Sequence, residues 1–455
     1  SFFLSKFGEY EKALGLTEVG LKINNRDARL YDAMGLSYTG LGEYDLALKS
    51  FDQSLQIDSK FVSALINKSR ALIELGQSND ALGILKGLVK SEKENIHVLN
   101  NLGLAFADIK EVSESIKVLE EAIEINNDFA EAHFNLARVL LMNGDYRRGW
   151  DEHEWRWKCR DFDSELRKFP YQAWNGEEIK GKKILIWSEQ GIGDEIMFLS
   201  PLQQLISDGA TVVLECSEKL VNIFSRSLPD VTVVSRTTPP KKDTLMSDIE
   251  FQLPLASLSR FYRKSSESFA ANSGKYLFPK TSLVAELNQR YRGLGDGPLV
   301  GICWKSGNLK VGAERSIPLE LWKQILLKKP CRFLSLQYGD SRSDTSIYEN
   351  NSDIHIHVDE KVNPLDDAES WFAQIATVDL VISVDNSTIQ VSGSQGVPTW
   401  TLVNFNPEWR FGLRGEKNDW HPSMKVYRQT KEGDWETIIS QVADDFTGWL
   451  ESFIG

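Results

Sequence analysis

The feature that most constrains the fold of this 455-residue chain is a spacing of 34 residues that recurs through its first third. Glycines mark the same point of successive copies at Gly8, Gly42, Gly76 and Gly144, with Lys110 in the one remaining copy. A second set of small residues keeps the same interval: Ala13, Ala47 and Ala81, followed by Ser115. A chain with a fixed period of this size folds as a stack of similar units that bury their apolar faces against one another.

The interval is that of tetratricopeptide repeats, in which each copy is a pair of antiparallel helices that cross at small residues. The sequence therefore predicts an α superhelix of tetratricopeptide repeats over residues 1–157. The first copy contains only its second helix, from which we expect that residues are missing upstream of Ser1.

Asparagine also recurs at the repeat interval, at Asn67, Asn101 and Asn135. These residues fall in the first helix of each repeat, which lines the concave groove of such a superhelix. A column of amides in a groove can hydrogen-bond an extended peptide backbone without reading its side chains. The alternative is that each asparagine bonds the neighbouring repeat. The sequence leaves both interpretations open, and Ala33 interrupts the column in the preceding copy.

Tryptophans are concentrated where the repeats end, at Trp150, Trp155, Trp157 and Trp174. These are too many large aromatic side chains for a free linker, because each buries a large apolar area. Residues 158–182 are therefore predicted to be a tryptophan-rich connector that holds the repeats against the next domain.

From Lys183 onward, strand-like and helix-like segments alternate. The predicted strands are 184–187, 211–216, 231–234 and 249–253 in a first series, and 299–304, 332–336, 354–358, 380–384 and 399–403 in a second. Such alternation gives parallel sheets with helices on both faces. We predict two doubly wound, Rossmann-like α/β domains, 183–292 and 293–430, with a hinge near 293–298 and a C-terminal helix over 431–455. Ligands of such sheets bind at the carboxyl ends of the strands, here across a cleft between the domains.

A short loop follows the first of these strands and contains Glu189, Gln190, Gly191 and Gly193, with a helix predicted from Asp194. Glycines at a strand-to-helix turn let a ligand approach the backbone closely. The carboxylate of Asp194 would repel a pyrophosphate, so it is better suited to accept a proton from a hydroxyl group. The alternative is an ordinary turn in which Asp194 caps its helix.

Polar residues follow three strands of the second series. The candidates are Lys305, Ser306, Arg315, Gln337 and the turn formed by Asp385, Asn386, Ser387 and Thr388. A lysine and an arginine beside a hydroxyl-rich helix N-terminus can hold a diphosphate. We therefore predict a nucleotide or nucleotide-sugar site at this edge of the second sheet, although Asp385 can also bind a ribose or cap its helix.

Charge and cysteine content exclude several other classes. The chain has 52 Lys and Arg against 65 Asp and Glu, a net charge of −13, and no long basic run, so no nucleic-acid partner is expected. Its four cysteines form no CxxC pair, which predicts a reduced, cytoplasmic protein without a cysteine-based metal site. No apolar run approaches the roughly 18 residues of a membrane span. Asp161-Phe162-Asp163 has the DxD form of some sugar-metal sites but lies in a polar linker, so we expect neither a metal nor a cofactor.

The second half of the chain resembles bacterial tetratricopeptide-fused glycosyltransferases in the stretches SEQGIGDEIMF, GICWKSGN, ERSIPLELW, FLSLQYG, DLVISVDNS, GVPTW, EWRFGLRG and DWHPSM. These enzymes are similar to the heptosyltransferase family, glycosyltransferase family 9, whose GT-B fold has two Rossmann-like domains. The resemblance covers essentially the whole chain, and the stretches occur in the family's order. The pairing of repeats with a transferase also resembles that of the O-GlcNAc transferases, whose repeat groove carries an asparagine ladder.

The resemblance implies a metal-independent, inverting transfer of a sugar from a nucleotide-sugar donor. Asp194 would then be the general base toward the acceptor hydroxyl. Lys305 and Arg315 fall where the family neutralises the donor diphosphate, and the turn 385–388 falls at the donor-binding position. The family's donor helix usually carries a histidine where this chain has Gln390, which can hydrogen-bond a phosphate but carries no charge.

Three functions remain open from the sequence. The first is a glycosyltransferase whose acceptor is a protein recruited by the repeats. The second is a glycosyltransferase for a lipid-linked or free glycan, with the repeats as a scaffold for partners. The third is a nucleotide-binding scaffold that has lost activity, which only Gln390 indicates. Trp409, Arg410 and Phe411 are candidates to flank the donor, although aromatic packing explains them as well, and His421 is expected to be a packing or rim residue.

Overall fold

The computed structural model describes residues 9–270, 274–308, 311–348 and 353–454. Gly8, the first glycine of the repeat column, lies outside the described residues. The chain forms two compact units, one made of Ser1–Asn143 with Asp151–Phe162 and the other of Gly144–Trp150 with Asp163–Gly455.

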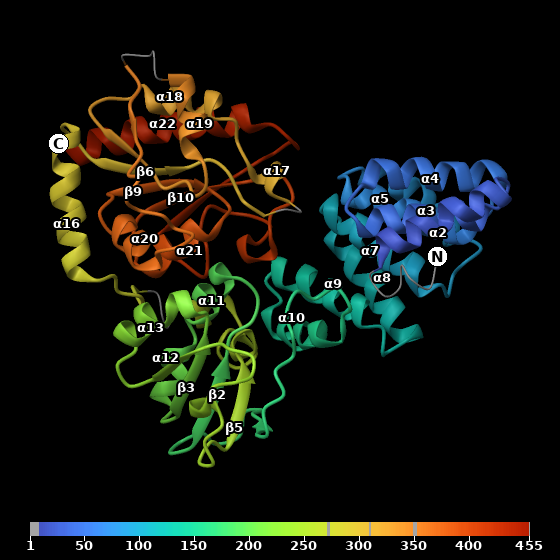
Figure 1. Ribbon diagram of the computed structural model, residues 1–455, viewed down its shortest axis with the longest axis horizontal. Helices are drawn as coiled ribbons and strands as arrows, with labels where there is room; N and C mark the ends of the chain where they lie inside the picture. Colours follow the sequence, from blue (N-terminus) through green and yellow to red (C-terminus); the bar gives the residue numbers. More distant parts are fainter. Residues whose placement is uncertain (1–8, 271–273, 309–310, 349–352, 455) are drawn as a thin grey trace. The chain divides into compact units, whose positions relative to one another are not determined.

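The first unit is built from helices that pack in sequence as antiparallel pairs (Figure 1). Their bounds are α2 (Tyr10–Ile23), α3 (Ala28–Gly40), α4 (Tyr44–Ile57), α5 (Val62–Glu74), α6 (Ser78–Leu88), α7 (Ile96–Asp108), α8 (Val112–Ile125), α9 (Ala130–Met142) and η1 (Glu154–Lys158). Between α9 and η1, helix α10 (Tyr146–His153) begins in the second unit and ends in the first. The first helices of successive pairs also contact one another, α3 with α5, α5 with α7 and α7 with α9. The predicted helical superhelix is thereby confirmed.

The repeated glycine is the turn between the two helices of a pair. The residues with positive φ at these turns are Gly42 (80°), Gly76 (72°), Lys110 (64°) and Gly144 (83°). In the first of them the amide of Glu43 donates to the carbonyl of Tyr38 at 2.9 Å, the hydrogen bond that closes a Schellman motif. Glycine recurs because a side chain is disfavoured in this left-handed conformation.

The second set of small residues lies where the helices of a pair cross. Ala13, Ala47 and Ala81 are fully buried. Ser115, which takes their place in the fourth copy, donates its hydroxyl to the carbonyl of Gly103 at 2.7 Å. The sequence period is therefore explained by one turn and one helix crossing per repeat.

The second unit contains two parallel sheets. The first has the order β1-β5-β2-β3-β4, formed by β1 (Gln172–Ala173), β2 (Lys183–Trp187), β3 (Thr211–Cys216), β4 (Thr232–Ser235) and β5 (Phe251–Pro254). The second has the order β11-β10-β9-β6-β7-β8, formed by β6 (Leu299–Cys303), β7 (Arg332–Ser335), β8 (Ile356–His357), β9 (Leu380–Val384), β10 (Thr399–Val403) and β11 (Met424–Arg428). All their strand pairs are parallel, as the alternating pattern predicts.

Helices connect the strands of both sheets. Those that accompany the first sheet are α11 (Ile192–Phe198), α12 (Leu202–Ser207), α13 (Val221–Ser227), α14 (Ser259–Tyr262) and α15 (Ser266–Phe269). Those that accompany the second are α16 (Thr281–Tyr291), α17 (Gly312–Arg315), α18 (Lys323–Leu326), α19 (Ser341–Thr345), α20 (Ala368–Ile375), α21 (Ser387–Ser394) and α22 (Trp435–Ile454). We call the first sheet with its helices the first lobe, and the second sheet with its helices the second lobe.

The strands β1 and β11 were not expected from the sequence. β1 lies within the segment predicted to be a connector and pairs with β5 through only two residues. β11 reads MKVYR, and its two cationic residues interrupt the apolar run that marks the other strands of this sheet. Lys425 is held outside the core by Asp445 of α22, at 2.6 Å between Nζ and Oδ2.

Helix α16 packs on the second lobe (Figure 1). At its end the hydroxyl of Tyr291 donates to Asp359 at 2.7 Å and accepts from Gln374 of α20 at 3.1 Å. The chain therefore enters the second lobe ahead of α16, earlier than the predicted hinge at 293–298. Within that segment Gly297 has a φ of 84°, and a Cβ on it would lie 2.3 Å from the carbonyl oxygen of Pro330, so this glycine is required by the turn into β6.

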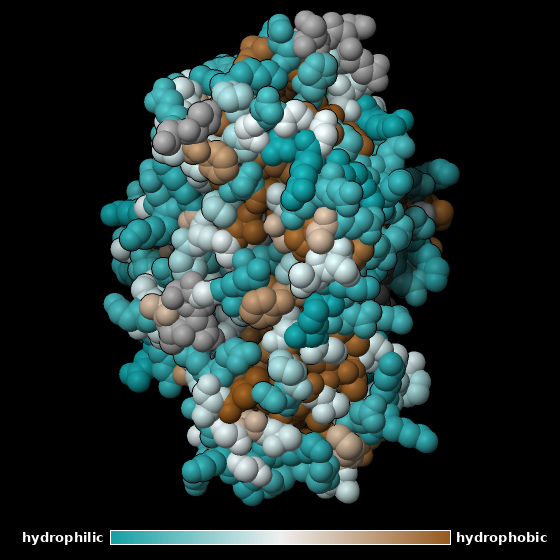
Figure 2. Space-filling view, turned by 90° about the vertical axis from the view of Figure 1, so that its left-hand side faces the viewer, coloured by the Kyte–Doolittle hydropathy of each residue, from teal (hydrophilic) through white to brown (hydrophobic). Residues whose placement is uncertain are grey.

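The surface seen from the side of α16 is largely hydrophilic, with apolar side chains in separate areas (Figure 2). Among the described residues, no helix combines the length and the apolar character needed to cross a bilayer.

Candidate functional site

The helix that carries Asp194 begins directly after β2. Gln190 has a positive φ of 62° and its amide donates to Ser164 at 2.7 Å, which turns the chain into α11. Gly191 stands at the N-cap position and Asp194 lies in the first turn of the helix. The interpretation of Asp194 as the helix cap is therefore wrong. A carboxylate in the first turn is favoured by the positive end of the helix dipole.

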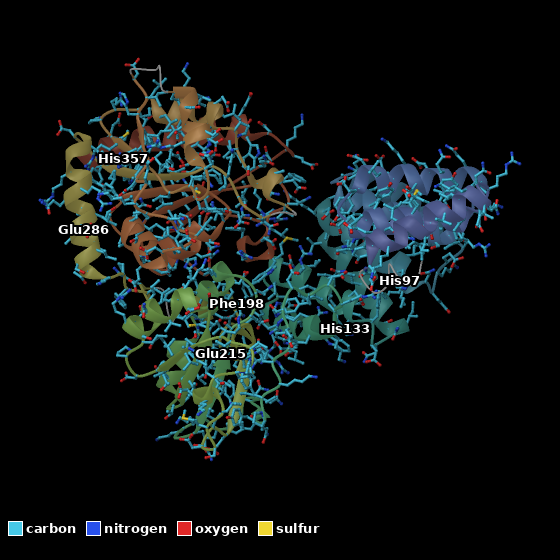
Figure 3. The ribbon with its side chains drawn as sticks, in the orientation of Figure 1. His97, His133, Phe198, Glu215, Glu286 and His357 are labelled. Atoms are coloured by element: carbon cyan, nitrogen blue, oxygen red, sulfur yellow. The ribbon has the colours of Figure 1, made fainter. Side chains whose placement is uncertain are left out.

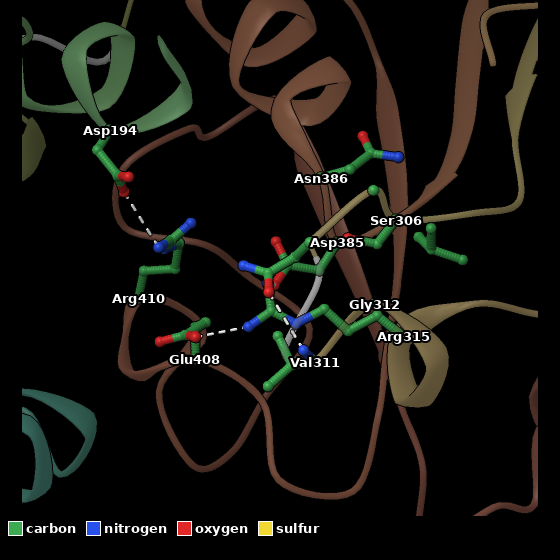
Figure 4. Close-up of polar contacts among 12 residues, drawn as sticks. Asp194, Ser306, Val311, Gly312, Arg315, Asp385, Asn386, Glu408 and Arg410 are labelled. Atoms are coloured by element: carbon green, nitrogen blue, oxygen red, sulfur yellow. Dashed lines mark hydrogen bonds and ion pairs between the residues drawn. The ribbon is translucent and has the colours of Figure 1, made fainter. Parts of the chain in front are cut away.

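The carboxylate of Asp194 meets an arginine from the second lobe (Figure 4). Its Oδ1 lies 3.2 Å from Nη2 of Arg410, and the two side chains are 23% and 16% exposed. Burial lowers the pKa of Arg410, but Asp194 and two further carboxylates, Asp385 and Glu408, outweigh burial and raise it. Arg410 is thus a firmly charged group among three acidic side chains.

Arg315, at the end of α17, joins two of the same carboxylates (Figure 4). Its Nη1 lies 2.9 Å from Asp385 and its Nη2 lies 2.5 Å from Glu408. Burial raises the pKa of Asp385, and the positive charges of Arg315 and Arg410 oppose that rise. We call Asp194, Arg315, Asp385, Glu408 and Arg410 the arginine–carboxylate cluster.

The loop after β6 is shaped by a buried amide. Oε1 of Gln337 accepts from the backbone amides of Trp304 and Lys305 at 3.1 and 2.8 Å, and its Nε2 donates to the carbonyl of Lys305 at 3.3 Å. Gln337 is only 9% exposed. Its amide thus holds this loop in place, whereas the sequence suggested that it binds the donor directly.

Two predicted donor-binding residues lie in that loop. The Nζ of Lys305 lies 2.6 Å from Asp344, and the lysine side chain is 49% exposed. The amide of Ser306 donates to the hydroxyl of Ser316 at 3.1 Å. The exposed Lys305 can therefore move toward an anionic ligand at small cost, since exposed ion pairs are weak.

The turn at the start of α21 is capped by Asn386. Its Oδ1 accepts from the amide of Thr388 at 2.9 Å, and its Nδ2 donates to the carbonyl of Lys305 at 3.2 Å. Asp385 is therefore free of the capping role and pairs with Arg315. Thr388 is fully buried, and Ser387 is half-buried.

Gly193 lets α11 approach α21 closely. A Cβ at this position would lie 3.2 Å from the hydroxyl oxygen of Ser387 and 3.6 Å from Cγ of Gln390. The sequence suggested that the glycines leave room for an acceptor. At Gly193, however, the neighbouring atoms belong to the helix of the second lobe.

Gln390 is 2% exposed, and its Oε1 lies 2.8 Å from Nε2 of His421, which is 1% exposed. Burial, together with the charge of Arg410, lowers the pKa of His421 to about 3, so the ring is neutral. A Cβ on Gly393 would lie 2.3 Å from the ring of His421, so that glycine makes room for it. His421 is a packing residue, and Gln390 bonds this ring.

Aromatic side chains hold the segment that carries Arg410. Trp409 lies 5.4 Å from Trp150 and 6.2 Å from Phe198 between ring centroids. Trp420 joins the same group, 6.1 Å from Trp150. Phe198 belongs to α11 (Figure 3), so this packing fixes the helix of Asp194 and the segment of Arg410 against each other.

Two glutamates are buried near Asp194: Glu189 of the predicted acceptor-side loop and Glu195 of α11. Glu189 is 2% exposed and accepts from the amide of Ala256 at 3.2 Å. Glu195, next to Asp194, is 1% exposed, accepts from the amide of Ser217 at 2.9 Å and lies 3.7 Å from Arg236. Both side chains thus serve the fold of the first lobe.

Glu195 predicts a pH dependence of stability. Burial raises its pKa from 4.5 to about 7, against the hydrogen bond from Ser217 and the charge of Arg236. Its contribution to folding stability is fully present below pH 4.5 and is lost as the pH rises to about 7, a loss of about 3 kcal/mol. Glu195→Gln keeps the hydrogen-bond acceptor and removes the charge, so the variant gains about 3 kcal/mol on the wild type between pH 4.5 and 8.

Urea unfolding of both proteins at a series of pH values measures this difference. Glu218→Gln, an exposed glutamate of the same lobe, is the control and is expected to follow the wild-type curve. Parallel curves for Glu195→Gln and wild type would contradict the assignment of the raised pKa to Glu195.

The repeated asparagines bond the preceding repeat. Nδ2 of Asn67 donates to Asp32 at 2.9 Å, that of Asn101 to the carbonyl of Ile66 at 3.2 Å, and that of Asn135 to Asn100 at 2.8 Å. These bonds favour the interpretation that the column joins successive repeats. A peptide-binding role for the three residues stays a prediction.

The structure thus brings together part of the predicted site. Asp194, Arg315 and Asp385 meet in the arginine–carboxylate cluster. Lys305, Gln337 and Asn386 form a neighbouring network around the loop after β6. Sequence reasoning missed Glu408, whose signal was its position two residues before Arg410 in the EWR stretch, and Asp344, which no motif marks.

Comparison with known proteins identifies the repeats. A family described as "Tetratricopeptide repeat" matches residues 38–101, and one described as "TPR repeat" matches residues 103–144. Residues 38–144 therefore contain tetratricopeptide repeats, which are a scaffold for protein interactions.

Over nearly its whole length the chain is similar to Protein FlbA of Caulobacter vibrioides, with 25% identity over 491 residues that cover 96% of this chain and 81% of FlbA. Among solved structures, TTC0263, a thermophilic TPR protein of Thermus thermophilus, is 22% identical with a TM-score of 0.31 and covers 33% of this chain and 82% of its own. MamA of Desulfovibrio magneticus RS-1 is 21% identical with a TM-score of 0.28 and covers 33% of this chain and 81% of its own.

Proposed function

We propose that the part of the chain after the repeats is a metal-independent, inverting glycosyltransferase with a GT-B arrangement, similar to the heptosyltransferase family. It would transfer a sugar from a nucleotide-sugar donor to a hydroxyl group. One observation carries the proposal: Asp194, which follows a strand of the first sheet, lies 3.2 Å from Arg410, beside Arg315 and Asp385 at the carboxyl end of the second sheet. A candidate base and a group of cations thus lie together where α/β sheets bind ligands.

The chemistry of these groups suits the transfer. Attack by a hydroxyl needs a base that accepts its proton, and Asp194 would serve as that base. Departure of the nucleotide develops negative charge on a phosphate, which Arg315 and Lys305 would stabilise. The buried amides of Gln337 and Asn386 keep the Lys305 backbone fixed, so that the lysine approaches the phosphate from a defined point.

The acceptor is proposed to be a protein. Tetratricopeptide repeats bind other proteins, and here they occupy the same chain as the proposed transferase. Recruitment by a repeat scaffold raises the local concentration of an acceptor at the linked domain.

A second candidate is a scaffold without transferase activity. It is favoured by the pairing of Lys305 with Asp344 and of Arg315 with two carboxylates, and by the bond between Gln390 and His421. These pairs would have to open before the cations could hold a phosphate.

Nucleotide binding separates the transferase from a scaffold whose cations stay paired and hold no nucleotide. In a thermal-unfolding screen of nucleoside mono- and diphosphates, the transferase is expected to be stabilised by about 2.7 kcal/mol by the matching nucleotide at about 100 times its Kd. Inorganic phosphate at the same ionic strength is the control and should give no comparable shift. If every nucleotide leaves the melting temperature unchanged, the scaffold is favoured and the transferase is rejected.

A further inference from the structure

We propose that Arg410 is the positioning residue for Asp194: it anchors one carboxylate oxygen so that the other faces the acceptor hydroxyl. This inference rests on the proposed function, because it presupposes that Asp194 is the base.

The two oxygens of Asp194 have different surroundings. Oδ1 lies 3.2 Å from Nη2 of Arg410. Oδ2 lies near Gly191: a Cβ placed on that glycine would be 3.8 Å from this oxygen. Within the described residues, Oδ2 has no hydrogen-bond partner. A carboxylate whose first oxygen is held by a guanidinium has its second oxygen in a fixed direction, and this is what a base needs before a hydroxyl arrives.

Arg410 is itself held by its neighbours on the chain. Its carbonyl accepts from Nδ2 of Asn418 at 3.1 Å. Two residues earlier in the chain, Glu408 binds Arg315 at 2.5 Å. Trp409, which stands between Glu408 and Arg410 in the sequence, packs on Trp150. The guanidinium therefore approaches Asp194 from a fixed backbone, although the two residues belong to different lobes.

The charge around Arg410 separates positioning from donor binding. Three carboxylates, Asp194, Asp385 and Glu408, act on its guanidinium. The phosphate is proposed to be held by Arg315 and Lys305, so removing Arg410 should change the affinity for an anionic nucleotide less than it changes the rate. The larger effect should fall on the rate at bound substrate, since misplacement of a catalytic group by about 1 Å can cost about 100-fold.

The first test splits rate from affinity in the full-length protein. Nucleotide release is measured on a panel of UDP-, GDP-, ADP- and CMP-linked sugars, and nucleotide Kd by calorimetry. Arg410→Ala is expected to lower kcat about 100-fold with Kd changed less than about threefold, and Arg410→Lys to recover at least about tenfold of that loss. Arg414→Ala, an exposed arginine of the same segment, is the matched control and should behave as wild type.

Two results of this test would overturn the inference. A kcat of Arg410→Ala within threefold of wild type would show that the anchor is not needed. A Kd that rises in proportion to the loss of activity would make Arg410 a donor-binding residue instead.

A second measurement does not depend on activity. The melting temperatures of Asp194→Ala, Arg410→Ala and the double variant form a cycle, and the double variant should lose at least about 2 °C less than the sum of the single losses. Additive losses would overturn the inference whatever the activity. A third outcome is that the losses of the variants are coupled but the wild type releases no nucleotide. This outcome would reject the proposed function and, with it, the role of Asp194 as a base, whereas the ion pair between Asp194 and Arg410 would stand.

Discussion

Replacing Asp194 by alanine is expected to lower the rate of sugar transfer by about 10²–10⁴-fold, the usual contribution of a general base. The protein should stay folded, because the side chain is 23% exposed and its partner Arg410 keeps two further carboxylates, Asp385 and Glu408. The loss should appear in kcat and not in nucleotide affinity. Among the described residues, Asp194 bonds Arg410 and forms no hydrogen bond or ion pair with Lys305 or Arg315, the residues proposed to hold the phosphate. Nucleotide release in the presence of acceptor, with calorimetry of the same nucleotide, measures both.

Asp194→Asn is the sharper variant, since it keeps the size of the side chain and an oxygen that can accept from Arg410. It should be as inactive as the alanine variant, because an amide does not accept the proton. Asp230→Ala, an exposed aspartate of the same lobe, is the control and should retain wild-type activity. Wild-type kcat in either Asp194 variant would remove Asp194 from the mechanism.

Much of the fold could be predicted from local patterns. The period of 34 residues predicts the repeat fold because each repeat has one residue at a left-handed turn and one small residue at a helix crossing, as at Gly42 and Ala47. The central strands are buried on both faces and read as apolar runs, for example LVISV in β9. Edge strands such as β11 lack this signal, because Lys425 and Arg428 lie among its apolar residues.

The position of the site could also be predicted, since polar residues at the ends of parallel strands must gather at one edge. The partners within it could not. Nothing in the sequence pairs Asp194 with Arg410, because 216 residues separate them and the contact depends on how two lobes meet. Local spacing likewise does not reveal that Gln337 is turned inward to bond the backbone of Lys305.

Gly193 illustrates how one residue type supports two interpretations. Glycine at a strand-to-helix turn fits both a close ligand and a close helix, and the sequence alone favours neither. The structure gives it a helix neighbour, with Ser387 of α21 at 3.2 Å from where a Cβ would lie. The approach of α11 to α21 is what brings Asp194 within reach of the second lobe, so this glycine bears on the site through the fold.

Replacing Arg315 by alanine is expected to destabilise the second unit by about 3–5 kcal/mol at neutral pH, the cost of leaving a buried charge unpaired. Asp385 is 4% exposed in its side chain and lies 2.9 Å from Arg315, so it would lose its nearest cation. Urea unfolding followed by tryptophan fluorescence measures the loss, and the thermal screen with the matching nucleotide should show a smaller shift in the variant, because Arg315 is also proposed to hold the phosphate.

The pH dependence of this loss follows from the sign of the pKa shift. Burial already raises the pKa of Asp385, and the positive charges of Arg315 and Arg410 oppose that rise. Arg315 has the larger effect of the two, so removing it lets the pKa rise further. The folded variant then keeps a proton that the unfolded chain releases above its ordinary pKa of 3.8, so the destabilisation is absent below that pH and grows as the pH rises. The matched control is the double variant Arg315→Met/Asp385→Asn. It removes the buried charge of Asp385 together with its cation and leaves only the partly exposed Glu408 without Arg315, so most of the stability should return. A single variant as stable as wild type from pH 4 to 8, or a double variant no better than the single one, would show that Asp385 does not depend on Arg315.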